Sequence, residues 1–221
     1  VTIENAKVSV MTHALNYGTG VFGGLRGYWN EEEEQLFVFR PLDHFKRLLG
    51  SCKMMRIELD YTPQQLVNIL LELLRTEGYR TNCYIRPLAY KGEERIGVSL
   101  HNISDAFTMF AIPFGRYVAN EEGAHVHFSA WRRIDDNAIP ARGKVTGAYA
   151  NSSLIKSDAI LSGYDEALVL NEDGHISEAS SSNFFMIRDG VAITPPIYAN
   201  NLEGIVRRSV IQLLQEDLGV E

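Results

Sequence analysis

The sequence predicts a two-domain α+β protein, with a small α/β domain at the N-terminus and a larger, β-rich domain at the C-terminus. Two amphipathic helical segments stand among apolar strands in the first half of the chain. Residues 113–124 then mix proline, glycine, asparagine and acidic residues between two apolar strands, as interdomain linkers do. Short strands with Asp-Gly turns follow. We therefore expect a small domain, a linker and a large domain over 1–112, 113–124 and 125–221.

Two segments of the first domain have the apolar periodicity of helices. The first begins at Pro41, which suits a first helical turn, and its apolar positions are Leu42, Phe45, Leu48, Leu49 and Cys52. The second has Thr62 as its expected N-cap, Pro63 at its first position and Gly78 as its end. Its apolar stripe consists of Leu66, Ile69, Leu70, Leu73 and Leu74. Strands are expected around this pair, over 35–39, 83–90 and 106–114.

The second domain is expected to begin with a strand on which Val126, Phe128 and Ala130 alternate with polar residues. A helix over 147–162 follows, and then two hairpins whose Asp-Gly pairs supply the left-handed conformations of tight turns. The last expected element is a helix over 202–218. A sheet of this kind normally needs further strands to close, so this domain is expected to be truncated at its C-terminal end.

Composition excludes several classes of protein. The net charge is -7 at pH 7, and 45% of the 221 residues are hydrophobic and 22% charged, which predicts a globular chain. Its basic residues are scattered, so we expect no nucleic-acid partner. No apolar run approaches the ~18 residues of a membrane span, so we expect no membrane partner. Two cysteines, Cys52 and Cys83, are too few for a disulfide framework and favour the cytoplasm.

Metal binding is also not expected. His125 and His127 alternate on the strand that begins the second domain, but no cysteine or acidic residue stands nearby at ligand spacing. We therefore expect the two histidines to lie on an exposed strand face.

Three polar side chains stand where structure alone does not require them. Lys144 lies in a loop after a strand, Tyr149 at the start of a helix, and Glu178 in a serine-rich strand. Singly, each has an ordinary explanation: a surface lysine, a packing tyrosine, an exposed glutamate. Together they match the needs of pyridoxal phosphate, which requires a Schiff-base lysine, a donor for its phenolic oxygen and an acid for its ring nitrogen. Arg47 is a candidate cationic anchor for its phosphate.

A family resemblance makes these assignments specific. Six segments occur in one order: HALNYGTGVFGGLRGY, VFRPLDHFKRLL, CYIRPLAYKG, AIPARGKVTGAYANSSL, GHISEASSSNFF and NLEGIVRRSVIQLL. In this order they resemble the class IV, fold-type IV pyridoxal-phosphate enzymes, and most closely the branched-chain amino-acid aminotransferases. The resemblance covers nearly the whole chain and implies the two-domain fold-type IV architecture. It also implies that Lys144 is the catalytic lysine and binds the cofactor together with Tyr149, Glu178, Arg47 and Asn183.

The same resemblance places the cofactor phosphate at the start of the last helix. Ile205 and Val206 would offer backbone amides to it, and a helix N-terminus is a preformed anion site. The family usually has a hydroxyl residue where Val206 stands. One phosphate hydrogen bond is therefore expected to be missing.

The resemblance also predicts the substrate pocket, with the residues Phe22, Tyr17, Tyr84, Arg86, Val98 and Tyr117. Several of these reach the site of a neighbouring subunit in the family, so a homodimer or higher homo-oligomer is expected. Aromatic side chains with one arginine suit an enzyme that takes Leu, Ile or Val and also the carboxylate of glutamate. The predicted reaction moves the amino group between branched-chain L-amino acids and 2-oxoglutarate.

Two features resemble other enzymes of the same fold. The segment EASSSN resembles the D-amino acid aminotransferases, and Gly23 stands where branched-chain enzymes commonly carry glutamate. A D-amino acid or (R)-amine transaminase is therefore an alternative. Aminodeoxychorismate lyase, which shares the lysine and the glutamate, is another. A non-catalytic cofactor-binding protein is a third, favoured by the expected truncation.

Overall fold

A computed structural model describes residues 1–115 and 123–219, which form two compact units. Unit 1 consists of Val1–Ala119 and Gly143–Gly147, and unit 2 of Asn120–Arg142 and Ala148–Glu221. Most of the predicted linker, 116–122, lies outside the described residues. The short segment with Lys144 belongs to unit 1, although it follows that linker in the sequence.

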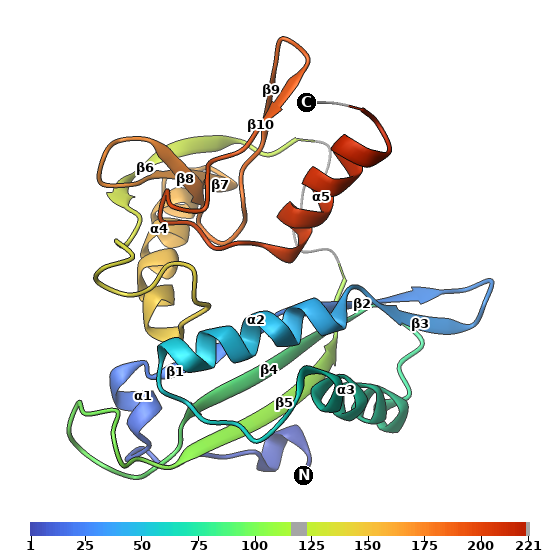
Figure 1. The fold of residues 1–221 in the computed structure, drawn as a ribbon, viewed down its shortest axis with the longest axis vertical. Helices are drawn as coiled ribbons and strands as arrows, with labels where there is room; N and C mark the ends of the chain where they lie inside the picture. Colours follow the sequence, from blue (N-terminus) through green and yellow to red (C-terminus); the bar gives the residue numbers. More distant parts are fainter. Residues whose placement is uncertain (116–122, 220–221) are drawn as a thin grey trace. The chain divides into compact units, whose positions relative to one another are not determined.

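A five-stranded antiparallel sheet forms the centre of unit 1 (Figure 1). Its strands are β1 (Gly20–Phe22), β2 (Leu25–Asn30), β3 (Gln35–Val38), β4 (Cys83–Lys91) and β5 (Asp105–Pro113). The long strand β4 pairs with β1 and β2 along one edge and with β5 along the other. Burial alternates strictly along β4, so Ile85 and Ala89 point into the core while Tyr84 and Arg86 share the opposite face.

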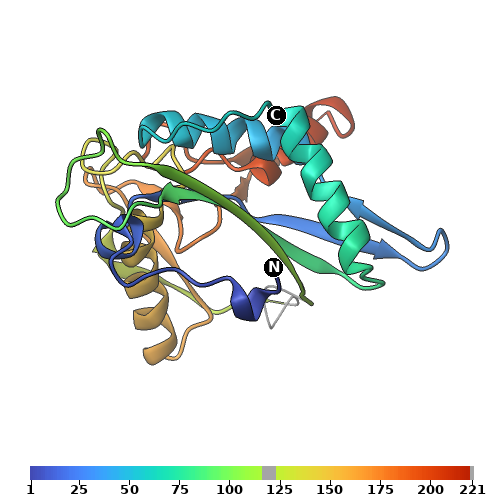
Figure 2. The ribbon, with the colours of Figure 1, turned by 90° about the horizontal axis from the view of Figure 1, so that it is seen from below.

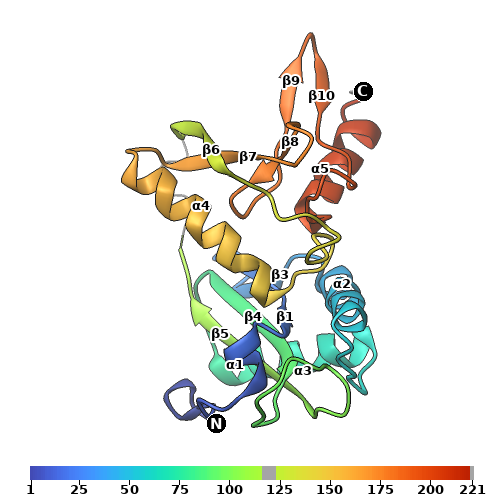
Figure 3. The same ribbon diagram turned by 90° about the vertical axis from the view of Figure 1, so that its left-hand side faces the viewer.

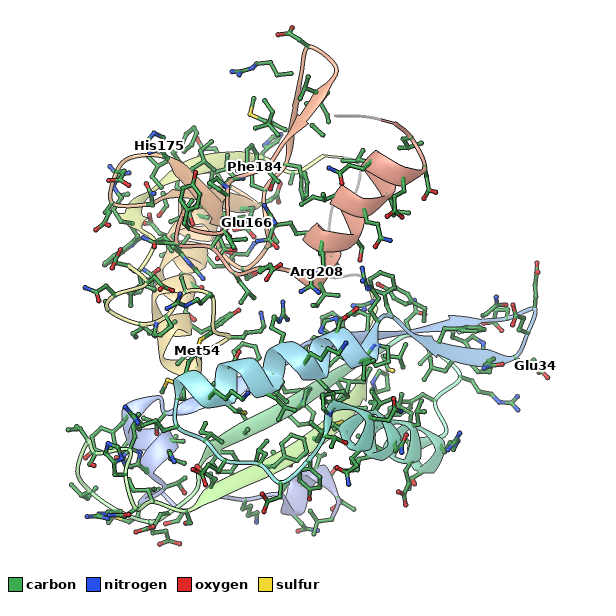
Figure 4. The ribbon with its side chains drawn as sticks, in the orientation of Figure 1. Glu34, Met54, Glu166, His175, Phe184 and Arg208 are labelled. Atoms are coloured by element: carbon green, nitrogen blue, oxygen red, sulfur yellow. The ribbon has the colours of Figure 1, made fainter. Side chains whose placement is uncertain are left out.

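Two helices, α2 (Pro41–Met54) and α3 (Pro63–Glu77), cover one face of this sheet (Figure 2). Phe45, Leu48, Leu66 and Leu70 are buried as the predicted periodicity requires, whereas Leu42, also assigned to the apolar face of α2, is exposed in its first turn. The capping signals also hold. Thr62 accepts a hydrogen bond from the Gln65 N–H in a capping box, and Gly78 ends α3 in a left-handed conformation. The Glu31–Glu34 run forms an exposed turn, and Glu34 is seen at the hairpin tip in Figure 4.

The N-terminal part of unit 1 contains a short 3-10 helix η1 (Ile3–Asn5) and α1 (His13–Tyr17). The buried imidazole of His13 contacts Thr19 Oγ1 and the Gly97 carbonyl oxygen, both at 2.7 Å. The contact with Gly97 ties α1 to the loop over 92–104.

Unit 2 contains a three-stranded sheet of β6 (Val126–Arg132), β7 (Glu166–Leu170) and β8 (Ile176–Ala179). The strands β6 and β7 are parallel and are connected through η2 (Thr146–Ala148) and α4 (Tyr149–Leu161), which lies along one face of the sheet (Figure 3). The core between them consists of Ile155, Ala159, Ala167 and Val169. The chain continues into the hairpin β9 (Met186–Arg188) and β10 (Val191–Ile193), and then into α5 (Ile205–Glu216).

Two expectations for unit 2 differ from the structure. The face of β6 that carries Val126 and Phe128 is exposed, whereas His127 points inward and its ring stacks on Tyr164 with a centroid distance of 4.6 Å. The prediction that both histidines lie on an exposed face is therefore wrong for His127. The last helix begins at Ile205 rather than at Leu202, because Gly204 is extended at its N-cap.

Two broader properties follow from the described parts of the chain. None of their helices combines the length and the apolar character needed to cross a bilayer. No group of three or more metal-ligating side chains gathers among these residues either.

Candidate active site

The backbone of Lys144 is fixed between β1 and α2 in unit 1. Its carbonyl oxygen accepts a hydrogen bond from the Phe22 N–H at 3.0 Å, and its own N–H donates to Ser51 Oγ at 3.2 Å. Ser51 is buried and in turn donates to the Arg47 carbonyl oxygen at 3.0 Å. The next residue, Val145, forms a bridge with Val21 of β1. The candidate lysine is therefore held in a rigid setting rather than in a free surface loop.

Aromatic and cationic side chains gather beside Lys144. Its Nζ lies 5.0 Å from the centroid of the Phe22 ring, and Arg86 Cζ lies 4.4 Å from the same centroid. Arg86 Nε–H also donates to the Tyr84 hydroxyl oxygen at 3.0 Å. The aromatic face attracts each cation and so lets two positive charges stand near one apolar ring. This arrangement suits a ligand that has both an apolar part and a carboxylate.

Helix α2 contributes two more groups to the same side of unit 1, Arg47 and His44, which are three positions apart. Burial above all, and then the positive charges of Arg47 and Lys144, lower the pKa of His44 from its usual 6.5 to about 3. The imidazole is therefore neutral at pH 7, and its buried Nδ1 accepts from no donor within the described residues. The positive charges of Arg47 and Lys144, both close to His44, match the needs of a phosphate group.

Two further pocket predictions lie together at α1 and the loop over 92–104. The Tyr17 hydroxyl oxygen accepts a hydrogen bond from the Gly97 N–H at 3.0 Å. Val98 follows and is 77% exposed. The predicted pocket residue Tyr117 lies outside the described residues.

Unit 2 holds Glu178 buried on β8. Its Oε1 lies 2.8 Å from an Arg133 nitrogen, and its Oε2 accepts from Asn183 Nδ2 at 3.1 Å and from the Leu202 N–H at 3.3 Å. Arg133 also donates to Ser152 Oγ at 3.0 Å. These donors favour the ionised carboxylate and set its orientation.

The amide of Asn183 connects Glu178 to the start of α5. Its Nδ2 donates to the Leu202 carbonyl oxygen at 2.8 Å as well as to Glu178. Gly204, the N-cap of α5, lies so close to Asn183 that a Cβ at position 204 would overlap its Oδ1. Gly204 has no side chain to cap this N-terminus, so among the described residues the amides of Ile205 and its neighbours are candidates for binding an anion.

The structure therefore groups the predicted site residues in two sets. Unit 1 brings Lys144, Phe22, Tyr84 and Arg86 together beside Arg47. Unit 2 holds the set of Tyr149, Glu178, Asn183, Ile205 and Val206, in which Tyr149 is the first residue of α4. That both sets serve one cofactor stays a prediction.

Sequence reasoning missed four residues of this region: Ser51, His44, Arg133 and Ser152. Two of them had a usable signal, because His44 and Ser51 stand three residues before and four residues after Arg47 on one helix. Arg133 and Ser152 had none, because their partners are distant in the sequence.

Comparison with known proteins decides the family. The family described as Amino-transferase class IV matches residues 20–221. The chain belongs to this family. It is 45% identical over its whole length to a probable branched-chain-amino-acid aminotransferase of Aquifex aeolicus, and 38% identical over 99% of its length to the branched-chain-amino-acid aminotransferase of Escherichia coli. It spans 71% of the length of each.

Solved structures of branched-chain aminotransferases resemble this fold closely. The branched-chain aminotransferase of Thermoproteus uzoniensis, crystallised with norvaline, has a TM-score of 0.95 and 41% identity, covering 100% of this chain and 73% of that one. A T.th. branched-chain amino acid aminotransferase, complexed with N-(5'-phosphopyridoxyl)-L-glutamate, has a TM-score of 0.91 and 42% identity. The match covers 100% of this chain and 72% of the T.th. chain. These matches confirm the fold-type IV prediction.

Proposed function

We propose that this chain is a pyridoxal-phosphate-dependent transaminase that moves the amino group between Leu, Ile or Val and 2-oxoglutarate. The observation that carries the proposal is the buried carboxylate of Glu178, which accepts hydrogen bonds from three donors. The chain also belongs to the class IV aminotransferase family. The two relatives solved with norvaline and with a phosphopyridoxyl-glutamate support the reaction and the cofactor.

The residues present fit pyridoxal phosphate. Glu178 is the acceptor for a protonated ring nitrogen, and Asn183 fixes that carboxylate. Tyr149 would contact the phenolic oxygen. When bound, the cofactor withdraws electrons from the substrate α-carbon. Lys144 would hold the cofactor and, once displaced by the amino donor, would move the proton at that carbon.

Two kinds of group are expected to bind the phosphate. Arg47 offers a guanidinium, and the uncapped start of α5 offers the amides of Ile205 and Val206. Val206 has no hydroxyl group to add. We therefore expect one hydrogen bond fewer to the phosphate than a threonine or serine at this position would give.

Substrate selection would depend on Phe22, Tyr84 and Arg86. Phe22 and Tyr84 offer apolar surface for a branched side chain, while Arg86 offers a cation for the side-chain carboxylate of glutamate. Gly23 packs closely against Pro87, since a Cβ at this position would lie 2.7 Å from Pro87 Cγ. A glutamate there would require the Pro87 ring to move.

The oligomer and the compartment are further parts of the proposal. We expect a homodimer or a multiple of it, since Leu15, Ile96 and Val98 expose apolar side chains beside a predicted pocket residue. Sedimentation equilibrium tests this: a monomer at micromolar concentration would contradict it. The cytoplasm is the expected compartment, because both cysteines are buried free thiols.

Absorbance spectroscopy tests the proposed reaction. The purified protein, loaded with pyridoxal phosphate and then separated from unbound cofactor by gel filtration, should be yellow, and L-leucine should bleach the colour while D-alanine and (R)-phenylethylamine leave it unchanged. Lys144→Ala should abolish the yellow band, whereas Lys53→Ala, which removes an exposed lysine of α2, should preserve it. Bleaching by D-alanine but not by L-leucine would favour the D-amino acid enzymes. Protein that stays colourless would contradict catalysis by this chain.

A further inference from the structure

A buried cation stands behind the candidate acid of unit 2. Arg133 follows β6 directly, and its N–H donates to the Leu170 carbonyl oxygen at 2.9 Å. Its side chain is buried, with one terminal nitrogen 2.8 Å from Glu178 Oε1 and the other donating to Ser152 Oγ at 3.0 Å. Arg133 is thus held at its backbone by β7, and at its guanidinium by α4 and β8.

Stability alone is a weak reason for such a pair. Removing two charges from water has a large free-energy cost, and well-packed apolar residues often replace a buried pair without loss of stability. Arg133 also leaves its Nε without an acceptor among the described residues, which adds to the cost. We therefore look for a role of the Arg133–Glu178 ion pair other than stabilising the fold.

The donors divide the two oxygens of Glu178 between them. Arg133 occupies Oε1, while Asn183 and the Leu202 N–H occupy Oε2. Donors on both oxygens prevent the carboxylate from rotating and favour its charged form. Without the guanidinium, a carboxylate buried at this depth would gain from binding a proton instead.

We propose that Arg133 is a positioning residue that keeps Glu178 ionised and oriented, and thereby keeps the ring nitrogen of the cofactor protonated. Ser152 supports this role by fixing the guanidinium. The inference rests on the proposed function, because it assigns the ring nitrogen to Glu178. An ionised Glu178 accepts the ring N–H, whereas a protonated one would donate to an unprotonated nitrogen and weaken the electron sink.

The test reads the ring nitrogen directly. Pyridoxal phosphate isotope-labelled at this nitrogen is bound to the wild-type protein, Arg133→Met and Arg133→Lys, and its NMR shift reports protonation at neutral pH. We expect a protonated nitrogen in the wild type and in Arg133→Lys, and an unprotonated one in Arg133→Met. Arg132→Met is the matched control, since Arg132 is the exposed neighbour, and should behave as wild type.

A second readout measures binding without catalysis. The affinity for pyridoxal phosphate is divided by the affinity for an analogue with carbon in place of the ring nitrogen. We expect Arg133→Met to lower this ratio about tenfold, the effect of losing a hydrogen bond to a charged group. If Arg133→Met does not fold, Ser152→Ala replaces it as the test. This variant removes one acceptor of the Arg133 guanidinium without leaving Glu178 as an unpaired buried charge, and we expect it to lower the affinity ratio by a smaller factor.

The outcomes separate the two proposals. The role of Arg133 would be overturned if Arg133→Met kept the ring nitrogen protonated and left the affinity ratio unchanged. Where only Ser152→Ala folds, the same result in that variant would overturn it. The proposed function would survive this result. A wild-type protein that binds both compounds equally, or neither, would instead contradict the assignment of Glu178 to the ring nitrogen, and with it the proposed function.

Discussion

Acid sensitivity of unit 1 can be predicted from His44. Burial and the charges of Arg47 and Lys144 lower the pKa of this histidine from 6.5 to about 3, so the folded protein resists protonating it. Above pH 6.5 the residue is neutral in both the folded and the unfolded state and has no effect on stability. As the pH falls below 6.5, the unfolded chain binds a proton that the folded chain does not bind. Stability is therefore lost between about pH 6.5 and pH 3.

The size of this loss follows from the pKa values. Each pH unit below 6.5 costs about 1.4 kcal/mol, so the loss at pH 5 is about 2 kcal/mol. His44→Gln removes the titrating group and should remove this part of the pH dependence, whatever it does to the packing. Arg47→Met should reduce the effect, because Arg47 contributes to the lowered pKa.

Unfolding by guanidinium chloride at pH 8 and at pH 5, followed by tryptophan fluorescence, measures how the free energy of unfolding changes between these pH values. The free energy of unfolding should fall by about 2 kcal/mol more in the wild type than in His44→Gln between these conditions. His125→Gln is the control, since His125 is exposed, and should keep the wild-type dependence. Equal pH dependence in the wild type and in His44→Gln would refute the reasoning.

Other predictions follow from single contacts. Burial raises the pKa of Cys52 to about 12 and also raises the pKa of Cys83. Neither thiol should therefore react with a disulfide reagent at pH 8 until the protein is unfolded. Fast labelling of the native protein would contradict this prediction. Gly204→Ala should overlap the Asn183 amide and weaken pyridoxal phosphate binding about tenfold or more in an absorbance titration, while unchanged affinity would argue against this contact. Val206→Thr should strengthen the same binding several-fold by supplying a hydroxyl donor, and a loss of affinity would place the phosphate elsewhere.

Local signals in the sequence predict the elements of unit 1 well. Pro41, Thr62, Pro63 and Gly78 mark helix ends through their own backbone preferences, and the structure confirms these marks. These signals act within one or two turns. They can therefore be recognised from the sequence without knowledge of the fold.

Contacts between distant segments explain what sequence reasoning could not predict. Ser51 meets the Lys144 N–H across 93 positions, and Arg133 meets Glu178 on another strand. Such pairs depend on the fold rather than on spacing. The reversed face of β6 has a similar cause, because alternation at His127 separates two faces but does not tell which of them is covered.

The covalent attachment of the cofactor to Lys144 is the central claim, and borohydride reduction followed by peptide mass spectrometry tests it most directly. The reduction fixes pyridoxal phosphate permanently to the amine that holds it. We expect the added mass on the peptide that contains Lys144, and none on peptides with Lys53 or Lys156. Modification of another lysine, or none at all in protein saturated with the cofactor, would contradict the account.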